Sequence, residues 1–193
     1  LILIIIIGNI SFLSSCSYKQ PKQTISNIKF DGQKIVEAYE KRDWETVVSI
    51  CDTVIDERDT MNLIILYAEA LAAVGNPQKA IYLLNKKLDR TPDDYYLYQT
   101  KGNVYYSAAM FDSAIICYEK VISMRPSYAR PYINVGDVYE LIGNKDKAIE
   151  NYWTAAKLFA INGYSEEAKE YAEKVLTLDS TNADAYDLLE SLQ

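Results

Sequence analysis

Apolar side chains recur at helical spacing through residues 61–162, in stretches of about a dozen residues that short polar turns separate. The pattern repeats as a whole, since Ala80, Ala114 and Ala148 are each 34 residues from the next. The heptapeptide around the first of these alanines, GNPQKAI, returns as GNKDKAI around the third, and AMFDSAI surrounds the second. This periodicity predicts three pairs of antiparallel helices, over 61–94, 95–128 and 129–162.

Residues of the same kind return at fixed positions of each unit: position 8 is small, positions 11 and 24 are large, and proline closes the unit. They are Ala68, Gly102 and Gly136 at position 8, Leu71, Tyr105 and Tyr139 at position 11, Leu84, Tyr118 and Tyr152 at position 24, and Pro92 and Pro126 at the end, with Ala160 departing from the proline. The pattern resembles the tetratricopeptide repeat, and the resemblance covers nearly all of residues 28–193. It implies an all-α fold, an α-solenoid in which helix pairs stack as a right-handed superhelix.

The small residues are expected where the two helices of a pair cross closely, because a larger side chain would overpack the crossing. The large residues then fill the wider gaps on either side. Most tyrosines are therefore predicted to be core residues, and six of them occupy the large positions of the motif: Tyr98, Tyr105, Tyr118, Tyr132, Tyr139 and Tyr152.

The flanks are weaker copies of the repeat. Residues 28–60 form a divergent first unit in which Val47 replaces the alanine, with a first helix near 33–41. At the other end, GYSEEA over 163–168 repeats the turn signature only 20 residues after Ala148. The helix near 145–161 is therefore expected to serve two units, with a partial unit and a capping helix over 163–193; a kinked stack is the alternative that the sequence leaves open.

The opening segment, LILIIIIGNISFL, is apolar but shorter than the roughly 20 residues that span a bilayer. With the small residues after it, the segment is typical of a signal peptide over residues 1–15, truncated at its start. Leu13-Ser14-Ser15-Cys16 resembles the lipobox of bacterial lipoproteins, which implies lipidation of Cys16 and a flexible tether over 16–27. Ser17 after the cysteine implies, by the same resemblance, an outer-membrane anchor facing the periplasm. An ordinary secretory peptide with a chance cysteine is the alternative.

Composition narrows the chemistry. The net charge of −7 disfavours nucleic-acid binding, and the absence of histidine removes the commonest general base and zinc ligand. Asp93-Asp94 and Glu166-Glu167 are expected at helix starts rather than in a catalytic pair. The sequence thus predicts no enzyme, no metal, no cofactor and no small-molecule substrate. Cys51 and Cys117 are predicted to be buried free thiols.

The resemblance also implies a concave groove lined by first helices, with motif positions 2, 5, 9 and 12 projecting into it. The candidate residues are Tyr96, Gln99, Asn103 and Tyr106 in the second strong unit and Arg130, Ile133 and Asp137 in the third. Asn134 at position 6 is expected beside them, and Glu140 occupies position 12 of the third unit. Such a groove would bind partner proteins or peptides, which makes a lipid-anchored scaffold for an envelope complex the leading hypothesis. The alternatives are an adaptor that delivers envelope proteases or peptidoglycan enzymes, and plain solvated helix faces.

Overall fold

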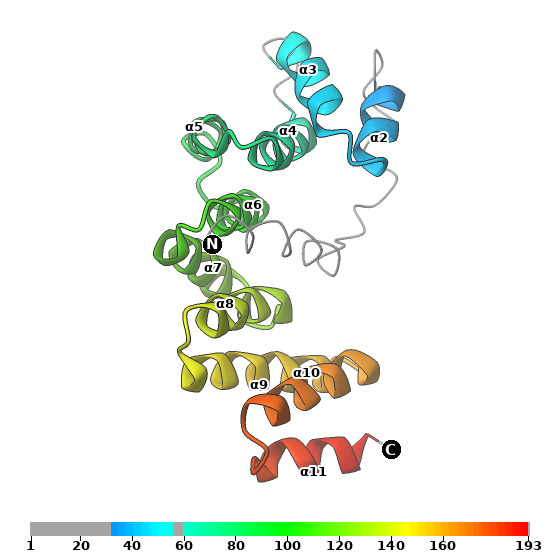
Figure 1. Cartoon of the computed structure of the whole chain (residues 1–193), viewed down its shortest axis with the longest axis vertical. Coiled ribbons are helices and arrows are strands. Elements are labelled where there is room, and N and C mark those ends of the chain that lie inside the picture. Colours follow the sequence, from blue (N-terminus) through cyan, green and yellow to red (C-terminus); the bar gives the residue numbers. More distant parts are fainter. Residues whose placement is uncertain (1–31, 56–59, 193) are drawn as a thin grey trace, which may run out of the picture. The chain divides into compact units, whose positions relative to one another are not determined.

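The computed structural model describes residues 32–55 and 60–192, and within these ranges it contains ten helices and no strand (Figure 1). The chain divides into two compact units, residues 1–43 and 44–193. The described part of the first unit contains α2 (Gly32–Glu40). The second contains α3 (Trp44–Val54), α4 (Met61–Ala73), α5 (Pro77–Leu88), α6 (Tyr95–Ser107), α7 (Phe111–Met124), α8 (Ala129–Leu141), α9 (Lys145–Ile161), α10 (Ser165–Leu178) and α11 (Ala183–Ser191).

Local sequence explains where these helices begin. Side chains of Asn76, Asn144 and Asn182 accept hydrogen bonds from backbone N–H groups in the first turns of α5, α9 and α11, and Asp94 does the same for α6. Pro77 opens α5, where its missing N–H costs nothing. The acidic pair at 93–94 therefore contributes a helix cap, as expected.

The turns inside the hairpins need a left-handed residue. Gly75 has φ +81° and Gly143 has φ +80°, and the N–H of the next residue reaches back into the preceding helix, as from Asn76 to the Leu71 carbonyl at 2.7 Å. Ala109 holds the same place in the α6–α7 turn with φ 56°, although it carries a Cβ. A motif position that suits glycine is thus occupied by alanine in the middle unit.

The three strong units are the hairpins α4–α5, α6–α7 and α8–α9, and each packs on the next (Figure 1). Ala80, Ala114 and Ala148 are completely buried at the crossings. A Cβ built on Gly136 would lie 2.7 Å from the ring of Tyr152, and one on Gly102 would collide with Tyr118. The prediction that small residues stand at the helix crossings is confirmed, both at position 8 and at position 20, which is the position of Ala80, Ala114 and Ala148.

The prediction for the tyrosines is only partly right. Tyr118 and Tyr152 are buried, with 2% and 0% of their surface exposed. The other four, Tyr98, Tyr105, Tyr132 and Tyr139, are half-buried. Tyr105, Tyr132 and Tyr139 pack against core clusters. A lysine lies over Tyr98, Tyr105 and Tyr139, at 4.8–6.0 Å from the ring centre.

The carboxyl end departs from the regular stack as the sequence predicts. Helix α9 is 17 residues long and packs on both α8 and α10. Tyr152 and Ala156 of α9 join Ala172 and Val175 of α10 in one core cluster. In α11 only Ala185 is buried, and the acidic residues Asp184, Asp187 and Glu190 are exposed.

The structure also bears on the sequence predictions for Cys51, Cys117 and Val47. Cys51 and Cys117 are free and buried, and burial raises the pKa of the Cys51 thiol to about 12. Val47 is completely buried on α3, at the place of the repeat alanine. The predicted signal peptide, the predicted lipidation site at Cys16 and the predicted tether lie outside the described residues. Among the helices that the structure describes, none has the length and apolarity needed to cross a bilayer.

Candidate functional site

The predicted groove residues fall on two first helices. Four lie on α6 and four on α8, at spacings of three and four that bring them to one side of each helix. Tyr96 is the most exposed, at 36%, whereas Ile133 and Asn134 are only 7% and 5% exposed. Ile133 packs with Ala129 and Ala155 in a core cluster, so the accessible part of the candidate surface on α8 is mainly Arg130 and Asp137.

Polar side chains on α6 form a small network around Asn103. The hydroxyl of Tyr118, which comes from α7, donates to Asn103 Oδ1 at 3.0 Å, and Gln99 Nε2 donates to the same oxygen at 3.3 Å. Both bonds use the amide oxygen, so the amide nitrogen of Asn103 remains able to donate. Gln99 Oε1 is enclosed, and no donor from the described residues reaches it.

The equivalent tyrosine of the next unit meets two carboxylates instead of an amide. Tyr152 Oη lies 2.7 Å from both Asp137 Oδ1 and Glu140 Oε2 on α8. From α10, Lys174 Nζ reaches Glu140 at 2.8 Å and lies 5.5 Å from the centre of the Tyr152 ring. This network, Asp137, Glu140, Tyr152 and Lys174, joins three helices; it is called the α8–α10 network below.

Protonation in the α8–α10 network follows from burial and contacts. Burial raises the pKa of Asp137, and the hydrogen bond from Tyr152 offsets this only in part. Burial also raises the pKa of Glu140, but the hydrogen bonds from Lys174 and Tyr152 outweigh it and hold that pKa below 4.5. Burial and the Asp137 charge raise the pKa of Tyr152, so its hydroxyl stays a donor at neutral pH.

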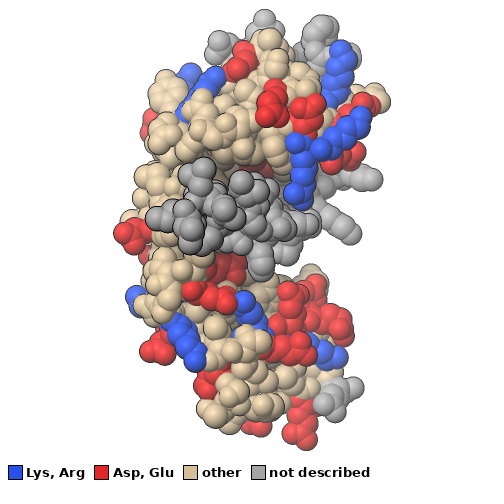
Figure 2. Space-filling model, in the orientation of Figure 1, with Lys and Arg blue, Asp and Glu red and all other residues tan. Residues whose placement is uncertain are grey.

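A similar arrangement occurs on α3, α4 and α5. The Tyr67 hydroxyl donates to Asp52, and Lys79 Nζ lies 2.6 Å from the same carboxylate oxygen. Hydrogen bonding to Asp52 raises the pKa of Lys79 to about 12. A tyrosine, a carboxylate and a lysine thus bridge three helices in both places, and side chains of both signs gather over these regions in Figure 2.

Comparison with known proteins shows which repeat family part of the chain resembles. Residues 95–128, 129–158 and 149–182 each match the family model of the tetratricopeptide repeat. Together the three matches span residues 95–182. The last two matches overlap within α9, which agrees with a helix that serves two units.

Solved structures share the tetratricopeptide fold at low identity. TTC0263, a thermophilic tetratricopeptide protein of Thermus thermophilus, superposes with a TM-score of 0.53 at 18% identity and covers 83% of this chain and 95% of its own. PcrH, crystallised with the chaperone-binding region of PopD, gives 0.55 at 15% identity and covers 63% and 92%. These similarities and the helix pairs establish an all-α tetratricopeptide-repeat solenoid.

A curated relative is the TPR repeat protein oca3 of Schizosaccharomyces pombe, 28% identical over 96 residues. The match covers 48% of this chain but only 33% of oca3. The chain therefore spans about a third of the length of this relative.

Sequence reasoning missed two features of the tetratricopeptide surface. It treated Tyr118 and Tyr152 as core alone, although each hydroxyl reaches the motif residue 15 positions earlier, Asn103 or Asp137. That shared spacing is a signal that the sequence does carry. It also missed Lys174, because the change of register after Ala148 hides which helix comes to lie beside α8.

Among the residues described, no three His, Cys, Asp or Glu are grouped in a way that could hold a metal ion.

Proposed function

We propose that this chain is a lipid-anchored tetratricopeptide scaffold that binds partner proteins or peptides at the bacterial cell envelope, where it serves the assembly or regulation of an envelope complex. The observation that carries the proposal is the face of α6, where Tyr96, Gln99, Asn103 and Tyr106 lie together on a rigid helix. Its position in a stack of repeats provides the fixed spacing that an extended partner requires.

The chemistry of this face suits a polypeptide. The amide N–H groups of Asn103 can donate to a peptide carbonyl, and the acceptor of Gln99 can receive a peptide N–H after a side-chain rotation. The two tyrosines offer flat amphipathic area at low entropic cost. The similarity to PcrH, which was crystallised with a segment of another protein, supports a partner of this kind.

The carboxylates on α8 indicate which charge a partner segment should carry. The next first helix, α8, carries two carboxylates, Asp137 and Glu140, and the single cation of their network, Lys174, pairs with Glu140. An anionic chain terminus would meet net repulsion there, because unscreened like charges raise the energy of a close approach. Neutral or basic segments are therefore the expected partners.

The α6 face is tested by affinity purification from detergent-solubilised native membranes, followed by quantitative mass spectrometry. The test variant combines Tyr96→Ala, Asn103→Ala and Tyr106→Ala. Partners recovered with the unmodified protein should be lost or strongly depleted, because a few central residues supply most of the binding energy at an interface.

The matched control combines Tyr82→Ala and Ile116→Ala on the second helices α5 and α7, where the side chains are 64% and 66% exposed. This control should keep every partner. Circular dichroism of both variants checks that the helices persist, since Asn103→Ala also removes the bond from Tyr118. Equal recovery by all three proteins would exclude the α6 face.

The anchor is tested separately at Cys16. The lipobox resemblance predicts that an alkyne fatty acid supplied to cells labels the protein, and that Cys16→Ser abolishes the label and releases the protein from the outer-membrane fraction. One acyl chain binds only marginally, so two or more chains are expected on the cysteine. A labelled Cys16→Ser protein, or an unlabelled native one, would contradict this part of the proposal while leaving the scaffold role standing.

A further inference from the structure

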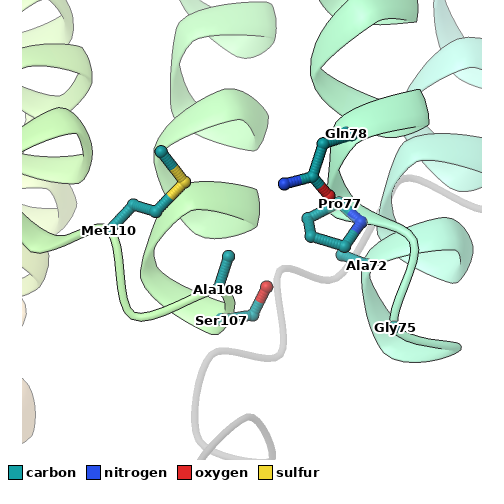
Figure 3. Close-up of a pocket in the computed structure, with 7 residues that line it drawn as sticks. All are labelled: Ala72, Gly75, Pro77, Gln78, Ser107, Ala108 and Met110. Atoms are coloured by element: carbon teal, nitrogen blue, oxygen red, sulfur yellow. The ribbon is translucent and has the colours of Figure 1, made fainter.

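A hollow of about 430 Å³ lies between two successive turns of the stack, the α4–α5 turn and the α6–α7 turn (Figure 3). We call it the turn hollow. Its lining is Ala72, Gly75, Pro77, Gln78, Ser107, Ala108 and Met110. The first turn supplies one wall and the second turn the other, so any occupant contacts two repeats at once.

Small side chains leave this space open, and the repeat itself does not require it. One unit further along the chain, the positions equivalent to Ala72 and Pro77 carry Tyr106 and Phe111, whose rings pack edge to face at 6.2 Å. The positions equivalent to Ser107 and Ala108 carry Leu141 and Ile142. The same place in the next pair of turns is therefore lined by much larger groups, and the turn hollow is particular to the first pair.

The lining combines apolar and polar surface in similar amounts, and two of its polar groups converge. Carbon and sulfur atoms of Ala72, Pro77, Ala108 and Met110 form the walls, and Figure 3 shows the Gln78 amide and the Ser107 hydroxyl directed into the space from different helices. Ser107 Oγ donates to the Val104 carbonyl at 2.9 Å, so its lone pairs remain as acceptors. None of the lining residues is ionisable.

The hollow is accessible at Met110. This lining residue is 42% exposed, and its unbranched side chain can adapt to an occupant. Ala72 has the same motif position on α4 that Tyr106 has on α6. The turn hollow therefore adjoins the carboxyl end of the first-helix face that includes the α6 candidates.

We propose that the turn hollow is a second contact site for the partner polypeptide, which inserts one uncharged apolar side chain there. The inference rests on the proposed function and adds the chemistry of the partner. A charged side chain would lose hydration without gaining a countercharge, whereas a leucine, methionine or phenylalanine would bury apolar surface against four apolar walls. The backbone next to this anchor has one donor and one acceptor, which Ser107 and Gln78 complement.

The experiment selects peptides from a phage-displayed library of random dodecamers on the purified protein, then measures the affinity of synthetic copies by fluorescence polarisation. Ala108→Trp fills the turn hollow, and Met110→Glu places a charge on its lining at an exposed position just before α7. Ala73→Trp is the matched control, because Ala73 is an exposed neighbour on α4 that does not line the hollow.

The expected result is a set of peptides that share one uncharged apolar residue and bind about 10-fold or more weakly to Ala108→Trp and to Met110→Glu, with Ala73→Trp unchanged. Met110→Glu keeps the test valid if Ala108→Trp fails to fold. Peptides that need Tyr96, Asn103 and Tyr106 but bind both hollow variants normally would overturn this inference and leave the proposed function intact. Peptides anchored in the hollow by a charged residue would overturn the chemistry, and the selection of no peptide would contradict both proposals.

Discussion

At the scale of the residue, Ala109 is notable for a left-handed backbone conformation that favours glycine. It has φ 56° where the equivalent turns use glycine, and a left-handed conformation costs a residue with a Cβ roughly 1–2 kcal/mol. We expect Ala109→Gly to raise the free energy of unfolding by about 1 kcal/mol, measured by urea denaturation. Ala108→Gly, one residue earlier at φ −86°, should lower it, because an ordinary conformation gives glycine only its entropic penalty.

The crossing at Gly136 offers a second test at this scale. Gly136→Ala puts a Cβ 2.7 Å from the fully buried Tyr152 ring, which has no free space to move into. Overpacking of this kind costs about 1–3 kcal/mol, and the better helix propensity of alanine returns up to about 1 kcal/mol. Denaturation should therefore show a net loss.

A double-mutant cycle identifies the cause of that loss. Gly136→Ala in a Tyr152→Leu background should cost much less than it does alone, because the ring that opposes the new methyl group is gone. Equal cost in both backgrounds would contradict a steric origin.

Much of this residue-level detail was accessible from sequence. The small residue at position 8 predicted a close helix crossing, although not that the large residue at position 24 of the same unit is what lies against it, Tyr118 against Gly102 and Tyr152 against Gly136. The partners of the tyrosine hydroxyls were not accessible, since the repeat pattern reports volume and apolarity but not where a single polar atom ends. Motif position 5 predicted that Ile133 projects into the groove, whereas its side chain packs in a core cluster.

At the scale of the element, the α8–α10 network connects helices that are not neighbours in sequence. Its Lys174–Glu140 pair is about one-third exposed on both sides, so solvent screening limits its worth to about 0.5–1 kcal/mol. We expect Lys174→Gln to lower the free energy of unfolding by that amount at pH 7.

The pH dependence of this effect has a defined sign. Because the folded state holds the pKa of Glu140 below 4.5, the pair stabilises above that pH and its contribution is lost as the pH falls through the folded pKa. The difference between Lys174→Gln and the unmodified protein, measured by denaturation, should therefore shrink as the pH falls below 4.5. Lys169→Gln is the control, since its partner Glu166 is 87% exposed. This substitution should hardly change the free energy of unfolding, at pH 7 or below pH 4.5.

The sequence predicted α9 as an element but not which helices it brings together. The alanine at 148 and the GYSEEA turn fixed its two ends, because caps and turns are local features. The approach of α10 to α8 depends on how a helix of 17 residues divides its surface between two partners. That division is a property of packing in three dimensions, and no local motif encodes it.

At the scale of the molecule, truncations of different length at the carboxyl end are expected to lower the stability by unequal amounts. Deleting residues 183–193 removes α11, in which only Ala185 is buried, and should cost little. Deleting residues 163–193 also removes Ala172 and Val175 from the cluster around Tyr152, and should destabilise the α8–α9 hairpin. Hydrogen exchange of the α9 amides distinguishes the two: equal protection in both truncated proteins would contradict the dependence of α9 on α10.

Because α9 belongs to two repeat units, it also limits where the chain can lengthen by repeat duplication during evolution. A duplicated copy of residues 95–128 can enter after Tyr128, because a complete hairpin ends there and another begins. No such joint exists after Asn162, since the same helix is already the opening half of the next unit. Insertion of a duplicated repeat is therefore disfavoured within α8–α10, and these three helices must be inherited as one block.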